Sequence, residues 1–146
     1  MTPRVLIIGL TVAVLGLAAG CATPGRIPSF SSATIRPETL KPGDRALITA
    51  DIRDRFGIVK SVVAIVRENP DIEIALKDDG VAPDLSPGDG VWTVDIVIPF
   101  EAPAGEFTLD VRGINEDGEV IAVPGAEGSA VPLSAEVHVS IHFASG

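Results

Sequence analysis

The sequence is poor in the residue types on which most site chemistry depends. It contains one cysteine, one tryptophan, five phenylalanines, two histidines and no tyrosine. A single cysteine excludes an internal disulfide, and so few aromatic rings leave little material for a sugar-stacking platform or an aromatic cage. No serine, histidine and aspartate have the spacing of a nucleophilic triad, and no glycine-rich loop leads into a predicted helix. We therefore expect that the protein is not an enzyme.

Positive charge is also scarce. The chain has 11 lysines and arginines against 20 aspartates and glutamates, which gives a formal net charge of −9 at pH 7. This balance argues against nucleic acid as a partner and against electrostatic docking on anionic lipid. An acidic surface can attract divalent cations or basic partners, or can simply keep the protein soluble.

The N-terminus, by contrast, carries a clear pattern. Arg4 is followed by an uncharged apolar run over 5–19, and small residues lie just before Cys21. This is the pattern of an export signal with its cleavage site. The apolar run is too short for a comfortable membrane span, which needs roughly 20 residues. We expect residues 1–20 to be a signal peptide that is cleaved.

The small residues that precede Cys21 resemble the lipobox of bacterial lipoproteins. The resemblance implies that Cys21 is acylated, for example with palmitate, and becomes the new N-terminus, so that the lipid bilayer is a partner. Each buried acyl CH₂ contributes about 0.8 kcal/mol, so several chains anchor firmly. Ala22 is not the aspartate that retains such proteins in an inner membrane, which implies the outer membrane, facing either the periplasm or the surface. The alternatives are a secreted protein with a free thiol or an uncleaved anchor helix.

The remaining chain divides into a tether and one domain. Residues 21–34 are rich in proline, serine, glycine and threonine and have no apolar period, which is typical of a flexible linker. Residues 35–146 consist of short alternating runs closed by turn residues. The predicted strands are 45–53, 58–67, 72–77, 91–99, 107–115, 120–123 and 134–143.

Alternation with a period of two, and no run with helical spacing, predicts an all-β domain. We expect an antiparallel immunoglobulin-like β-sandwich of seven or eight strands, a size that suits about 100 residues. Trp92 and Phe107 are the predicted core aromatic residues. For Trp92, the alternative is an exposed binding residue.

Three segments carry a second resemblance: ITADIRDRFGIVKSVVAIV, LKDDGVAPDLSPGDGVWTVDI and PAGEFTLDVRGINEDGE. Together they resemble bacterial immunoglobulin-like or fibronectin type III-like extracellular modules over roughly residues 40–143. The DDG…D…GDG-aromatic-T loop is the most specific part. The resemblance implies a non-enzymatic spacer or binding unit on an envelope protein, and it names no partner.

The loop between two predicted strands contains four aspartates, Asp78, Asp79, Asp84 and Asp89. Calcium prefers six to eight oxygen ligands, often including several carboxylates, so the loop could hold a structural calcium ion. Its spacing is not that of the EF-hand calcium loop. Turn formation explains the same residues, because aspartate binds nearby backbone amides and glycine accepts positive φ. Both interpretations stay open at this point.

These observations lead to one expectation of function and one alternative. We expect an envelope lipoprotein that acts as a binding or scaffolding module, with a protein partner in the envelope. The alternative is an accessory subunit that positions a partner in an envelope enzyme or transport complex. If the strand over 58–67 or the one over 134–143 lies at a sheet edge, it could pair with a partner strand.

Overall fold

The computed structural model describes residues 27–143. The predicted signal peptide and Cys21 lie outside these residues. Residues 27–143 contain strands and no helix, so this part of the chain holds no helix that could cross a membrane. The all-β prediction is confirmed. The strands are β1 (Ser29–Arg36), β2 (Thr39–Leu40), β3 (Arg45–Arg53), β4 (Ser61–Val66), β5 (Glu73–Leu76), β6 (Val91–Val97), β7 (Gly105–Ile114), β8 (Ala122–Pro124), β9 (Ala130–Pro132) and β10 (Ser134–Ile141).

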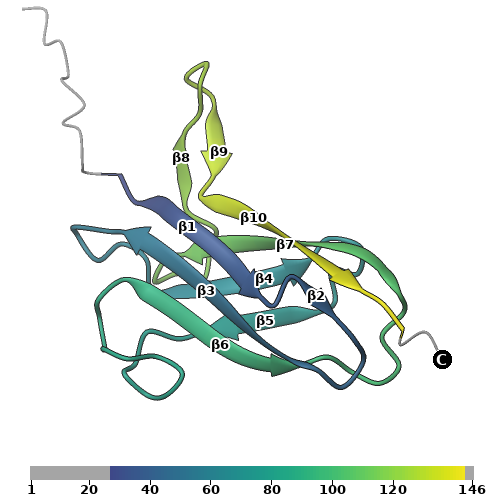
Figure 1. Ribbon diagram of the computed structural model, residues 1–146. Coiled ribbons are helices and arrows are strands. Elements are labelled where there is room, and N and C mark those ends of the chain that lie inside the picture. The colour runs from purple at the N-terminus through teal and green to yellow at the C-terminus, as the bar shows by residue number, and fades with distance from the viewer. Residues whose placement is uncertain (1–26, 144–146) are drawn as a thin grey trace, which may run out of the picture.

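The strands form two main sheets and one hairpin (Figure 1). One sheet has the order β1-β3-β6 and the other has the order β2-β10-β7-β4-β5. Every neighbouring pair is antiparallel except β2 and β10, which run parallel. The hairpin of β8 and β9 projects from the body of the domain.

The core lies between the two main sheets. On β3, the alternate residues Ala46, Ile48, Ala50 and Ile52 are all buried, as alternation with a period of two predicts for the strand over 45–53. The facing sheet contributes buried side chains from β4, β7 and β10, namely Val62, Ala64, Leu109, Val111, Val137 and Val139. Burial of each large apolar side chain stabilises the fold by about 1.5–3 kcal/mol, and these residues form one continuous cluster.

The boundary between tether and domain differs from the prediction. Residues 29–34, expected in the flexible linker, form most of β1, which pairs with β3 from Ser29↔Arg53 to Arg36↔Leu47. A register shift between Phe30 and Ser32 breaks the alternation there. That irregularity, with three serines in the strand, explains why the segment has no readable apolar period.

The edges of the sheets are also not those that the sequence suggested. β4 is an interior strand between β7 and β5, and β10 has β7 on one side and the short β2 on the other. The hypothesis that either strand lies at a sheet edge is therefore wrong for β4. For β10 it holds only along the part of the strand that the two-residue β2 does not cover. In the two main sheets, the outer strands are β1, β6, β2 and β5.

Candidate functional site

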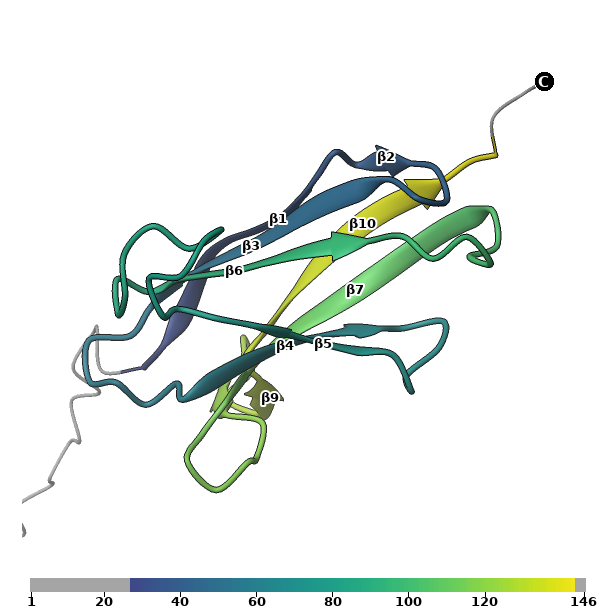
Figure 2. The ribbon, with the colours of Figure 1, turned by 90° about the horizontal axis from the view of Figure 1, so that it is seen from below.

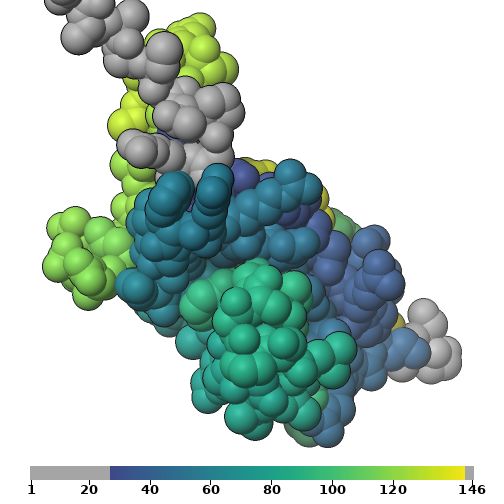
Figure 3. All heavy atoms as spheres, turned by 90° about the vertical axis from the view of Figure 1, so that its left-hand side faces the viewer, coloured from purple at the N-terminus to yellow at the C-terminus, as the bar shows by residue number. Residues whose placement is uncertain are grey.

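The aspartate-rich loop connects β5 to β6 at one end of the domain. An isolated bridge closes its base, where the backbones of Lys77 and Thr93 exchange hydrogen bonds of 2.8 and 2.9 Å. The loop lies beside the end of β3, because the Ile52 amide donates to the Gly90 carbonyl at 2.9 Å. Figure 3 shows it as a compact knob next to the segment that leaves β3. The described chain begins at this same end, since Ser29 lies opposite Arg53.

Two aspartates fold the loop by accepting backbone hydrogen bonds. Asp78 Oδ1 accepts from the Gly88 amide at 2.6 Å, and its Oδ2 accepts from the Gly90 amide at 3.0 Å. Asp84 Oδ2 accepts from the Gly80 amide at 2.5 Å, and its Oδ1 accepts from the Ser86 amide at 3.3 Å. These contacts are the turn chemistry expected of aspartate, so the loop has a defined shape through its own side chains.

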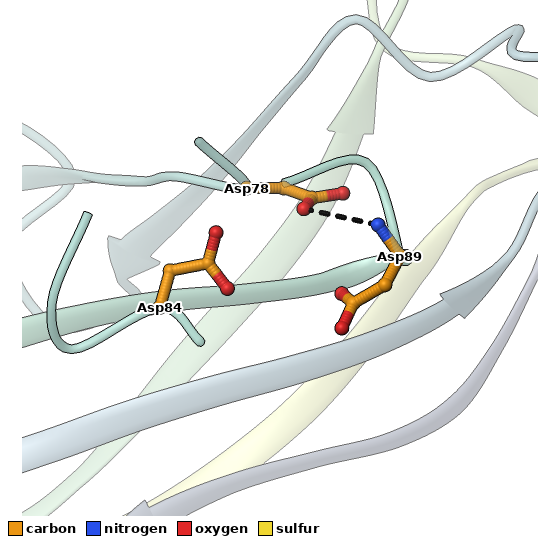
Figure 4. Close-up of side chains that lie close together, drawn as sticks. All are labelled: Asp78, Asp84 and Asp89. Carbon is orange, nitrogen blue, oxygen red and sulfur yellow. Dashed lines mark hydrogen bonds between the residues drawn. The ribbon is translucent and has the colours of Figure 1, made fainter. Parts of the chain in front are cut away.

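The same folding brings three carboxylates together. One carboxylate oxygen from each of Asp78, Asp84 and Asp89 lies within 4.8 Å of the others (Figure 4). Asp84 is only 4% exposed, Asp78 is half-buried and Asp89 is exposed. Asp79, the fourth predicted residue, is not part of this cluster; its Oδ1 accepts from the Val81 amide two residues later.

The electrostatics of the cluster favour charge on its buried member. The hydrogen bond from the Gly80 amide is the main cause that lowers the pKa of Asp84, and it outweighs the desolvation that would raise it. Asp84 is therefore a carboxylate at neutral pH. It faces two further acidic side chains, so like charges are held close together.

The donor set fits a hard divalent cation. Calcium binds oxygens at about 2.3–2.6 Å, so oxygens spread over 4.8 Å can lie on opposite sides of one ion. Asp78 Oδ1 accepts from the amides of both Gly88 and Asp89, which occupies its two lone pairs. Asp78 Oδ2 and the two oxygens of Asp84 each accept one of these side-chain hydrogen bonds, so each keeps a lone pair for an ion. Asp89 uses Oδ1 to accept from the Val91 amide, and its Oδ2 accepts no hydrogen bond from the described residues.

Trp92 and Phe107 are both half-buried and pack against the core. Trp92 also lines a cavity of about 530 Å³ next to the loop, together with Asp78, Asp89 and the arginines Arg53 and Arg55. The cluster therefore lies beside an open polar cavity.

The two histidines lie away from the loop, on the outer face of the other sheet. Both are exposed, and His142 Nε2 lies 2.7 Å from the Ser140 hydroxyl. That hydroxyl donates to Glu106 Oε1 at 2.5 Å, so the carboxylate contacts the serine and does not orient the imidazole. This is not the order of a nucleophilic triad, in which the acid orients the base.

A second cavity, of about 490 Å³, lies at the opposite end of the domain and was not predicted from the sequence. It is lined mainly by apolar side chains of β5, β6 and β7, with the segment that follows β6 at its mouth. The alternation of apolar and polar residues along a strand predicts which side chains face inward. It does not predict whether another strand covers those side chains.

Comparison with known proteins adds nothing to these sites. What the chain offers chemically is a preformed cluster of oxygen ligands at one end and an apolar cavity at the other. No known protein-family model and no curated protein sequence matches the chain.

Proposed function

We propose that this chain is an envelope lipoprotein, held at the outer membrane by acylated Cys21. Its domain is an immunoglobulin-like β-sandwich that serves as a non-enzymatic binding or scaffolding module, with calcium stabilising the loop over 78–90. The signal-like pattern over 1–20 and the lipobox-like residues before Cys21 support the anchor.

The order of the strands supports the immunoglobulin-like assignment. In that fold, the second strand lies between the first and the fifth in one sheet, and the sixth lies between the third and the seventh in the other. If the short β2 and the separate hairpin of β8 and β9 are set aside, seven strands remain. Their sheets, β1-β3-β6 and β10-β7-β4-β5, have this arrangement. The chain has neither tyrosine nor a disulfide, so apolar packing replaces the tyrosine corner and the cystine of antibody domains.

The convergence of three carboxylates is the observation that carries the calcium proposal. Buried Asp84 is held charged by backbone amides, and Asp78 and exposed Asp89 bring further negative charge within 4.8 Å. A bound cation would remove the repulsion among them and supply bonds across the loop. Because the ligands come from both ends of the 78–90 segment, the ion would fix the loop against β3 and β6.

The test is thermal unfolding of the full chain with calcium and with chelator. Selective binding to the native state stabilises it by RT ln(1 + [L]/Kd), about 2.7 kcal/mol at 100 times Kd. For a domain of this size we expect a rise in Tm on the order of 10 °C. Asp89→Asn should remove the rise, since it keeps the hydrogen bond to Val91 but loses the charge. The matched control Asp79→Asn, outside the cluster, should keep it; an equal rise in both variants, or none in the unmodified protein at millimolar calcium, would reject the site.

A further inference from the structure

The second cavity opens where the two main sheets separate. Its lining is apolar and comes from both sheets: Ile72 and Ile74 lie on the β5 side, Ile96 and Ile98 on the β6 side, and Phe107 and Leu109 at its base. Its volume of about 490 Å³ is within the range of sites that bury a ligand. At this end, the core is accessible from outside the domain.

The strands on either side of this cavity, β5 and β6, have backbone edges that are largely unpaired. They are joined only at the Lys77↔Thr93 bridge and then diverge, as Figure 2 shows. The backbone amide and carbonyl of Thr93 bond to Lys77 and therefore point away from β3. Because these groups alternate in direction along a strand, the amides and carbonyls of Asp95 and Val97 also point away from β3.

The same reasoning applies to β5. The Ile72 carbonyl accepts a hydrogen bond from the Val66 amide of β4. By the register of β4 and β5, the residues whose backbone amides and carbonyls point toward β4 are therefore Ile72, Ile74 and Leu76. Glu73 and Ala75 therefore direct their amides and carbonyls away from β4. Among the described residues, these groups of Glu73, Ala75, Asp95 and Val97 have no hydrogen-bond partner in another segment.

The apolar lining and the unpaired backbone edges together determine which kind of ligand the cavity between β5 and β6 can bind. An extended strand places alternate side chains on one face, about 6.6 Å apart, and its backbone can bond both edges. The mouth carries the exposed apolar residues Ile72 and Val97, which are 45% and 55% exposed. Glu73 and Glu101 are also exposed beside the mouth, and this negative charge favours a basic occupant.

We propose that the wedge between β5 and β6 (residues 72–77 and 93–98) binds an extended, basic-flanked segment of a partner protein as an added strand. Apolar side chains of that segment fill the cavity, and its backbone pairs with β5 and β6. The site lies at the end opposite the loop over 78–90, because Arg45 pairs with Val97 while Asp51 pairs with Val91. It depends on neither calcium nor acylation of Cys21, so it can fail or succeed independently of them.

The experiment uses the full chain in lipid nanodiscs and three fluorescent synthetic peptides. All alternate valine with threonine. The first has lysines at both ends, the second has glutamates there, and the third repeats the first with N-methyl groups on alternate amides. Anisotropy reports binding, and hydrogen exchange reports protection of the amides of Ala75, Asp95 and Val97. We expect the first peptide to bind and protect these amides, with affinity at least about tenfold lower for each of the others.

Two variants separate pairing from general damage. Val97→Pro removes one outward N–H at a sheet edge, where proline is tolerated, and should lower affinity for the first peptide at least about tenfold. Ala33→Pro is the matched control at the other edge of the same sheet, where the Ala33 amide also faces outward by the register of β1, and should leave affinity unchanged. If Val97→Pro does not fold, Ala75→Pro on β5 gives the same test.

Three results would overturn the proposal. The first is that no peptide binds the unmodified chain. The second is equal affinity for the methylated and unmethylated peptides, which would make the cavity a site for an apolar ligand such as an acyl chain. The third is equal binding by the Val97→Pro and Ala33→Pro variants.

Discussion

A single carboxylate, Asp84, organises the centre of the aspartate-rich loop. Its two oxygens accept backbone hydrogen bonds from Gly80 and Ser86, while the side chain itself is almost fully buried. A buried carboxylate with such partners keeps its charge, whereas its protonated form loses acceptor capacity and leaves amides unsatisfied. The conformation of the loop therefore depends on the ionisation of this residue.

This dependence predicts a pH effect on stability. The pKa of Asp84 is lower in the folded state than its ordinary value of about 3.9. Its contribution is thus present above pH 4 and is lost as the pH falls through the lower folded pKa. Asp84→Asn should lower Tm at pH 7 in chelator, and the fall in Tm between pH 7 and pH 3 should be smaller than in the unmodified protein.

The control for this pH series is the variant Asp71→Asn, because Asp71 is an exposed residue in a turn. It should reproduce the unmodified pH profile. If Asp84→Asn shows the same fall in Tm as Asp71→Asn, the carboxylate of Asp84 does not couple loop folding to pH.

The sequence could identify the candidate residues of this site but not their arrangement. Aspartate and glycine between two alternating runs predict a turn whatever their order. The selection of Asp78, Asp84 and Asp89, with Asp79 excluded, depends on which side chains reach back across the loop. Such contacts arise from the path of the backbone, which the composition of a loop does not determine.

At the scale of elements, prediction succeeded where one face of a strand is buried and the other is exposed. β3 has this pattern along its length, and its predicted bounds of 45–53 agree with the structure. The prediction was wrong for β1, where a register shift interrupts the alternation. The predicted strand over 120–123 overlaps β8, but β9 and its pairing with β8 were missed. No residue of β9 is buried, so it has no apolar period.

The junction of the loop with β6 offers a prediction about an element. Gly90 has φ of +87°, and a Cβ there would lie 2.6 Å from the Ile52 carbonyl oxygen. Gly118 has φ of +80° in a turn, and a Cβ there would meet nothing within 4 Å. Gly118→Ala should cost about 1–2 kcal/mol through backbone strain alone. Gly90→Ala should cost more, because the end of β3 must also move.

Urea unfolding of the two variants measures this difference in unfolding free energy. The comparison isolates the contact between Gly90 and β3, because both glycines share the left-handed conformation. Equal losses of free energy would mean that the start of β6 can shift without cost and that the loop is not fixed against β3.

The two ends of the domain differ in the chemistry that they present. One end holds the start of β1, the end of β3 and the aspartate-rich loop. The other end holds the open apolar cavity, and β1 alone extends over about 26 Å between them, at about 3.3 Å per residue. If the chain is anchored at Cys21, the first end faces the membrane and the second faces a partner.

This orientation gives the last prediction. From Cys21 to Ser29 the chain can span at most about 29 Å, so the loop over 78–90 should remain close to the bilayer. Leu85 and Phe100 are 95% and 79% exposed and belong to opposite ends. A photoreactive residue at position 85 should crosslink to lipid several-fold more than one at position 100, in cells that also incorporate labelled palmitate into the protein.

Cys21→Ala is the control for both readouts. It should abolish the palmitate label, release the chain from the membrane fraction and remove the lipid crosslinks from position 85, because burial of the acyl chains supplies the anchoring free energy. Membrane partition that persists without label would disprove the lipid anchor. Equal crosslinking from positions 85 and 100 in the labelled protein would instead keep the anchor and reject the orientation, because a domain that tumbles freely on its linker exposes both ends to the bilayer alike.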